Sequence, residues 1–174
     1  MTKFARLATV AATLASVALV ATPTLAAPVG ATTPATAKAQ IVRPLTLTAK
    51  QNLDFGTIVL TAVTGATNVA VSTAGAVTCG VGLTCSGTPK QAIYNVAGTN
   101  NQVVKIYSAT SNLVNAADST TIVFTPALPT GASVTLTNSG APGTDFNVGG
   151  SIALGTTTTD GVYTGNMNVT VDYN

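Results

Sequence analysis

The chain has 174 residues, of which 46% are hydrophobic and only 7% are charged. It contains no histidine and no glutamate, so the commonest general base and the usual nucleophile–base pairs are missing, and we expect neither enzymatic activity nor a cofactor. The seven basic residues form no cluster that could neutralise several phosphates, and nucleic acid is therefore not expected as a partner.

The N-terminus has the order of a secretory signal peptide. Lys3 and Arg6 precede an apolar run over residues 7–20, and small residues follow up to Ala26. This order predicts a signal peptide over residues 1–26 and export to the periplasm, the cell surface or the medium. The apolar run is shorter than the roughly 20 residues that cross a bilayer, so no transmembrane segment is expected in the mature protein.

The next segment, residues 27–39, consists mostly of Ala, Thr and Pro with one Lys, which predicts a flexible leader. A second small-residue site ends at Ala39, so the mature chain starts after Ala26 or after Ala39. Removal of residues 1–26 leaves five basic residues and five aspartates. A chain without net charge repels its own copies weakly, which favours association.

Residues 40–174 are expected to form a single domain, long enough for a hydrophobic core. Val, Ile, Thr and Tyr alternate there with polar residues at a period of two, and turn residues separate the segments. This pattern predicts an all-β fold, an antiparallel immunoglobulin-like β-sandwich. The expected strands are 41–49, 53–60, 68–72, 92–97, 103–108, 121–125, 132–137, 151–154 and 162–173.

Cys79 and Cys85 are the only cysteines. In an exported chain, two cysteines close in sequence predict a disulfide. A metal pair is the rival interpretation, but without histidine a zinc site would lack ligands, and no metal is expected.

The last predicted strand alternates over its whole length, with a glycine at its start and Tyr173 next to the final residue. This pattern resembles the C-terminal strand of chaperone–usher fimbrial subunits, or pilins. The resemblance implies a pilin-like sandwich, like subunits and a periplasmic chaperone as partners, and a strand that enters the assembly. The matching positions are Gly161, Tyr163, Met167, Val169, Val171 and Tyr173.

The first predicted strand has two interpretations. Its apolar face is interrupted by Arg43 and is formed by Ile41, Leu45, Leu47 and Ala49. It is either a donor strand that fills the open groove of a neighbouring subunit by strand addition, or the first strand of its own complete sandwich.

A second resemblance covers nearly the whole mature chain, through residues 41–47, 53–56, 79–87 and 161–165. The chain is similar to a family of small secreted bacterial domains of unknown function. We therefore expect a secreted structural or adhesive protein, a fimbrial subunit or a cell-surface sandwich completed by strand addition. The alternative is a self-contained monomeric binding domain, for carbohydrate or a surface protein, without a role in assembly.

Overall fold

The computed structural model describes residues 27–174, so the expected signal peptide over residues 1–26 lies outside the described part. Residues 27–39 are exposed throughout and contain no helix or strand. Residues 40–174 form one compact unit. No helix within residues 27–174 has the length and apolar character of a membrane span.

The compact unit is built from β-strands and one short 3₁₀ turn, and residues 27–174 contain no α-helix. This confirms the all-β prediction. The elements are β1 (Thr46–Gln51), β2 (Thr57–Leu60), β3 (Thr67–Val71), β4 (Val77–Cys79), β5 (Leu83–Ser86), β6 (Ala92–Ala97), β7 (Val103–Ser108), β8 (Ser111–Asn115), β9 (Thr121–Ala127), η1 (Thr130–Ala132), β10 (Ser133–Thr135), β11 (Thr144–Leu154), β12 (Tyr163–Thr164) and β13 (Val169–Tyr173).

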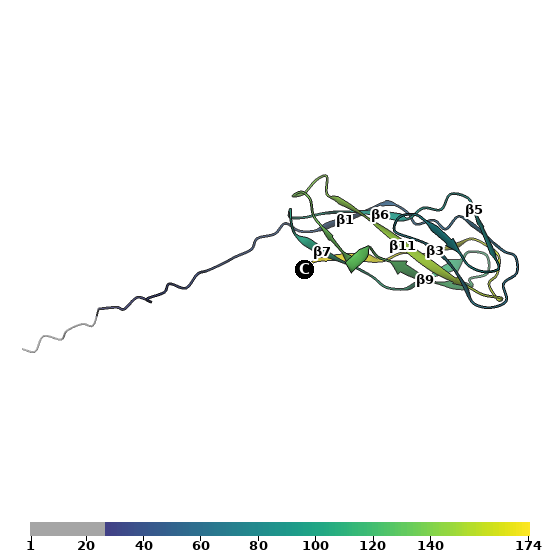
Figure 1. Ribbon diagram of the computed structural model, residues 1–174, viewed down its shortest axis with the longest axis horizontal. Coiled ribbons are helices and arrows are strands. Elements are labelled where there is room, and N and C mark those ends of the chain that lie inside the picture. Colours follow the sequence, from purple (N-terminus) through teal and green to yellow (C-terminus); the bar gives the residue numbers. More distant parts are fainter. Residues whose placement is uncertain (1–26) are drawn as a thin grey trace, which may run out of the picture. The chain divides into compact units, whose positions relative to one another are not determined.

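Every strand pair is antiparallel, as expected for a β-sandwich. The large sheet has the order β1-β6-β11-β9-β8-β12, with β3 on the second half of β11 and β4 on β3. A smaller sheet has the order β10-β7-β13, and β2 pairs with β5 as a separate ribbon. In Figure 1, β6 and β3 lie along one side of β11, and β9 lies along its other side.

The long strand β11 links the two halves of the large sheet. Its first half, residues 144–148, pairs with β6, and residues 150–154 pair with β3. Two glycines lie where the partner changes: a Cβ on Gly149 would collide with the backbone around Val71, and one on Gly150 would collide with the ring of Phe124. Glycine is therefore required here by the close approach of neighbouring strands.

The core consists of two clusters. Half-buried Leu53 and Met167 pack against both, so they join the clusters. The first cluster is Ala92, Val96, Val104, Ile106, Leu136, Phe146 and Val148. The second cluster is Val69, Ile122, Phe124, Ile152 and Leu154.

Several expected strand boundaries were wrong: the strand expected at 151–154 begins already at Thr144, and most others are shifted by one to three residues. Three further differences concern the first, second and last expected strands. The first strand begins at Thr46, not at residue 41, because Pro44 has no N–H and the N–H of Arg43 bonds to Thr99 Oγ1 at 2.7 Å. The segment 53–60 becomes a strand only at Thr57. There Gly56 has a φ of +73° and its N–H bonds to Asp54 Oδ1, which makes a turn.

The third boundary concerns the C-terminal segment 162–173, which is not one strand. It is divided into β12 and β13, which belong to different sheets, and residues 165–168 pair with no strand. Strands β4, β5 and β8 were not predicted, because they are short and rich in Ser, Thr, Cys and Asn. By contrast, β6 and β7 have the predicted bounds.

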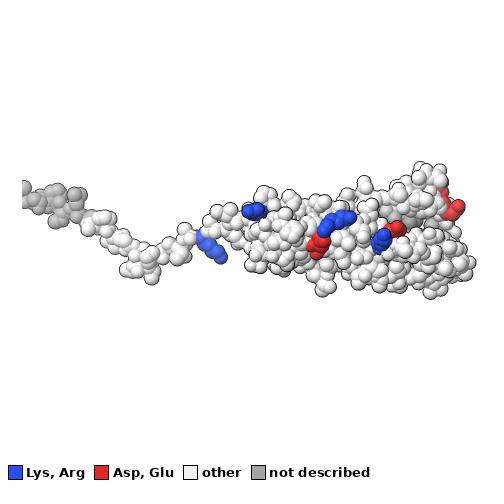
Figure 2. All heavy atoms as spheres, turned by 90° about the horizontal axis from the view of Figure 1, so that it is seen from above, with Lys and Arg blue, Asp and Glu red and all other residues white. Residues whose placement is uncertain are grey.

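Charge is sparse on the sandwich. The face seen in Figure 2 is almost wholly uncharged, and at two places on it a basic group lies beside an acidic one. Within residues 27–174 the one salt bridge joins Lys50 Nζ to Asp145 Oδ2 at 2.7 Å. A hydrogen bond from Asn95, and then the one from Lys50, lowers the pKa of the Asp145 carboxyl.

Candidate functional site: a groove beside the core

A groove of about 1320 Å³ opens on the core of the sandwich. One wall is formed by residues 51–60, which run from the end of β1 through β2, and the other by residues 160–168, which run through β12 to the start of β13. The floor is formed by apolar core side chains: Ala92, Tyr94, Leu113, Ile122, Phe124, Ile152 and Leu154. Most of these floor side chains are buried, with Phe124 only 2% and Ile152 only 4% exposed, whereas Tyr94 and Leu113 are half-buried.

The two walls are not joined as neighbouring strands would be. Each wall strand pairs on one side only: β2 with β5, β12 with β8 and β13 with β7. No backbone hydrogen bond between residues 51–60 and 160–168 is present in the described part of the chain. A polar contact near this seam runs from Tyr94 Oη, which donates to the carbonyl of Met167 at 3.4 Å. The unpaired edges of β2 and β12 thus leave backbone groups for another partner, whereas Asp54 in the first wall already pairs with Lys90.

Of the residues expected from the C-terminal strand, Gly161, Tyr163 and Met167 line the groove, whereas Val169, Val171 and Tyr173 lie in β13 and do not. Val169, Val171 and Tyr173 are half-buried against the first core cluster, Tyr163 packs against the second, and Met167 against both. The even-numbered neighbours Thr164, Asn168, Thr170 and Asp172 are exposed. Gly161 has a φ of +143° and lies so close to the Asn115 side chain that no Cβ would fit. The alternation is present, and its role in assembly stays a prediction.

The Tyr173 hydroxyl, at the end of the chain, forms hydrogen bonds with the segment that precedes β1 and with the loop after β6. It donates to the carbonyl of Arg43 at 2.6 Å and accepts from the N–H of Thr99 at 2.9 Å. The sequence contains no signal for this link, because Arg43 and Tyr173 are 130 positions apart. Residues 40–45 are therefore tied to the sandwich, although they belong to no strand.

The four candidate donor residues do not share one environment. Ile41 is 91% exposed, whereas Leu45 packs against the first core cluster. Leu47 and Ala49 lie in β1, opposite Val96 and Tyr94 of β6 in the same chain. Residues 46–51 thus form a strand of their own sandwich, and the chain before them does not.

Cys79 and Cys85 form the expected disulfide. It connects β4, which extends the large sheet, to β5 of the small ribbon, and so fixes the ribbon that carries one groove wall. Within residues 27–174 there is no group of three or more acidic or cysteine side chains placed to hold a metal ion.

A polar cluster fixes the other wall at its start. Asp118 accepts from the hydroxyls of Thr120 at 2.6 Å and Thr159 at 2.8 Å, and Tyr163 Oη contacts both threonines. Hydrogen bonds lower the pKa of the Asp118 carboxyl. The largest contribution comes from Thr120, and Thr159 adds to it. Bonds to the same two threonines lower the pKa of Tyr163. These contacts hold the chain before β12 against the turn between β8 and β9.

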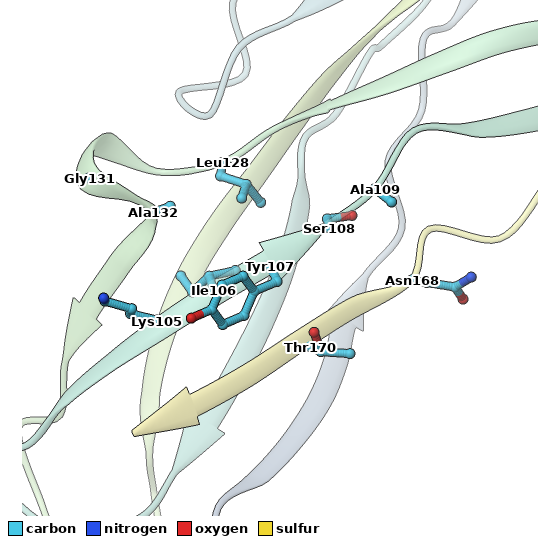
Figure 3. A pocket seen from close by; sticks show the side chains of 10 residues that line it. All are labelled: Lys105, Ile106, Tyr107, Ser108, Ala109, Leu128, Gly131, Ala132, Asn168 and Thr170. Atoms are coloured by element: carbon cyan, nitrogen blue, oxygen red, sulfur yellow. The ribbon is translucent and has the colours of Figure 1, made fainter. Parts of the chain in front are cut away.

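A second, shallower hollow of about 590 Å³ lies on the outer face of β7. Tyr107 is 52% exposed there, and its ring lies between Leu128 and Ala132 on one side and Asn168 and Thr170 on the other (Figure 3). Tyr107 is the one strongly exposed aromatic side chain within residues 27–174. An exposed aromatic ring is suited to stacking against a small polar ligand.

The family described as "Domain of unknown function (DUF4402)" matches residues 45–173. No curated protein and no solved structure matched the chain.

Proposed function

Since the chain belongs to the DUF4402 family, whose description assigns no activity, its function has to be inferred from the groove, and we propose that it is a pilin-like structural or adhesive subunit. In this proposal the protein is exported, works at the cell surface as part of a fimbrium or similar assembly, and catalyses no reaction. Its sandwich is completed by a strand from outside its own fold.

The open groove is the observation that supports this proposal. An extended segment lying in it would cover half-buried lining residues such as Leu113 and Met167 and would meet wall strands that each have one unpaired edge. Backbone pairing supplies affinity and pockets for alternate side chains supply specificity in this mode of binding. A sheet edge that is left open in a nearly uncharged protein also favours association.

The proposal includes a periplasmic chaperone. A subunit with a groove that is bordered by free strand edges needs a temporary cover during export, because free strand edges and partly exposed apolar side chains promote aggregation. A chaperone strand laid into the groove would meet this need, and the strand of the next subunit would later replace it.

The test is the size of the mature protein with and without its leader. We expect the exported protein to form oligomers or fibres in size-exclusion chromatography and electron microscopy. A variant that starts at Gln40 keeps β1 and the whole sandwich, so it should fold but not polymerise. Truncation up to Ala49 would be a poor variant, because it removes most of β1 and tests stability instead.

Two results would contradict the proposal. One is a mature protein that is monomeric at all concentrations and gains no stability from added leader peptide. The other is a leaderless variant that polymerises as well as the mature protein. In either case the groove would not be filled by strand addition.

The hollow around Tyr107 favours a second candidate, a self-contained carbohydrate-binding domain. Its exposed ring would stack on a sugar, with Thr170 as a hydrogen-bonding group. A glycan array would show binding that Tyr107→Ala abolishes and that Val103→Ala, an exposed change on the same strand, leaves intact. An array without signal would remove this candidate.

A further inference from the structure

Met167 is the one methionine in residues 27–174, since the other methionine of the chain is Met1. It lies between β12 and β13, in the segment 165–168, where it is half-buried and lines the groove. Its side chain packs against both core clusters. Met167 therefore connects the core to a groove that solvent can enter.

The segment 165–168 has few other contacts that hold it in place. It pairs with no strand, and its other members are one glycine and two exposed asparagines. Two side-chain hydroxyls bond to its backbone: Tyr94 Oη donates to the Met167 carbonyl at 3.4 Å, and Ser111 Oγ donates to the Asn166 carbonyl at 3.2 Å. Both distances exceed the usual range of about 2.5–3.0 Å for such bonds, so both bonds are weak. Apolar packing of Met167 is thus the main contact of this segment with the core.

The rest of the chain offers few alternatives to a mild oxidant. Among protein side chains, thiols and thioethers are the groups that peroxides oxidise by two electrons. Cys79 and Cys85 are joined in a disulfide, and residues 27–174 contain no free cysteine. The chain also has no tryptophan and no histidine. A peroxide should therefore have one target in the folded domain.

We infer that Met167 is an oxidation site, and that its reaction with a hydroperoxide such as hydrogen peroxide releases the segment 165–168 from the core. The thioether sulfur attacks one peroxide oxygen, so that an S–O bond forms and the O–O bond breaks. The other oxygen leaves as hydroxide and takes up a proton to become water. The sulfur loses two electrons, which the peroxide gains. This inference does not depend on what fills the groove.

The release follows from the polarity of the product. The buried residues of both core clusters have hydrocarbon side chains, which donate no hydrogen bond to a sulfoxide oxygen. Burial of a polar oxygen without a donor is unfavourable, so the oxidised side chain should turn away from the core. The groove wall at 165–168 then becomes loose. Methionine sulfoxide reductases restore the thioether, which makes the change reversible.

The experiment compares the mature protein before and after treatment with hydrogen peroxide. We expect intact mass to rise by one oxygen atom, and peptide mapping to place this atom on Met167. Hydrogen exchange of the amides in β12 and β13, which flank the segment, should become about tenfold faster. The amides of residues 144–148, in the first half of β11, should change by a smaller factor. Treatment with the reductases should restore the slow exchange.

Two substitutions separate oxidation from other effects of peroxide. Met167→Leu keeps an apolar side chain of similar volume and forms no sulfoxide, so its exchange should be slow with or without peroxide. Met167→Gln places a polar side chain of similar length at the same position. It should show the fast exchange of β12 and β13 without any oxidant.

Three results would each overturn the inference. In the first, Met167 of the folded protein resists a peroxide treatment that fully oxidises it in urea. In the second, Met167 is oxidised but the exchange of β12 and β13 stays as slow as before. In the third, Met167→Leu responds to peroxide like the unaltered protein. All three are measured on single molecules in solution, so they leave the proposed assembly function untouched.

Discussion

At the scale of single residues, the C-terminal strand has side chains that pack against the core next to side chains that are exposed to solvent. Val169 and Val171 pack against the first core cluster, and Thr170 between them is exposed. Tyr173 adds a hydrogen-bonding function at the end of the same face. The face, not the residue type alone, therefore decides the cost of a substitution.

Val169→Asp places an unpaired carboxylate among apolar side chains. We expect it to lower the free energy of unfolding by about 3 kcal/mol or more, measured by urea denaturation, and to reduce accumulation after export. The matched control is Thr170→Asp, which should change stability by less than about 0.5 kcal/mol. Equal behaviour of the two variants would show that β13 is not packed as described.

Tyr173→Phe removes a hydroxyl that joins Arg43 and Thr99. Each lost hydrogen bond costs about 1 kcal/mol, so unfolding should become easier by about 1–2 kcal/mol. Tyr107→Phe is the control, because Tyr107 is exposed and its hydroxyl has no hydrogen-bond partner within residues 27–174. Thermal melts that are identical for all three proteins would contradict the proposed link.

At the scale of the elements, each strand has a position that its own sequence does not reveal. β11 serves three partners along its length, and two glycines make this crowding possible. β12 and β13 follow each other in sequence but join different sheets. The gap between them, residues 165–168, leaves one groove wall without a strand partner.

The disulfide acts at this scale, because it holds the β2–β5 ribbon to β4. Replacing both Cys79 and Cys85 by serine should lower the free energy of unfolding by about 2 kcal/mol, since the bond closes only a short loop. Reductant should shift the unaltered protein by a similar amount and leave the serine variant unchanged. A variant as stable as the parent would mean that the bond does not constrain the ribbon.

At the scale of the whole molecule, the mature N-terminus decides whether the leader exists. Cleavage after Ala26 keeps residues 27–39, and cleavage after Ala39 removes them. The leader-dependent assembly proposed above requires the first site. Intact-mass analysis of the exported protein should therefore show the loss of 26 of the 174 residues, with both cysteines protected from alkylation. A chain that starts at Gln40 would contradict the proposed donor.

The sequence alone was enough to predict an all-β antiparallel fold, the bounds of β6 and β7, and the disulfide. These features depend on local properties: a period of two, β-branched residues, turn residues and two cysteines close in sequence. The wet and buried faces of the C-terminal segment follow from the same periodicity.

Only the tertiary structure decided which strands are neighbours, that residues 162–173 divide between two sheets, and that a groove opens over Phe124 and Ile152. It also placed Tyr173 against Arg43 and β1 in its own sandwich. These features depend on contacts between residues far apart in the chain, and strand periodicity contains no information on which partner a strand will meet. The physical reason is that the backbone N–H and C=O groups of a strand form hydrogen bonds with other strands. The side-chain pattern of a strand indicates only which of its faces is buried.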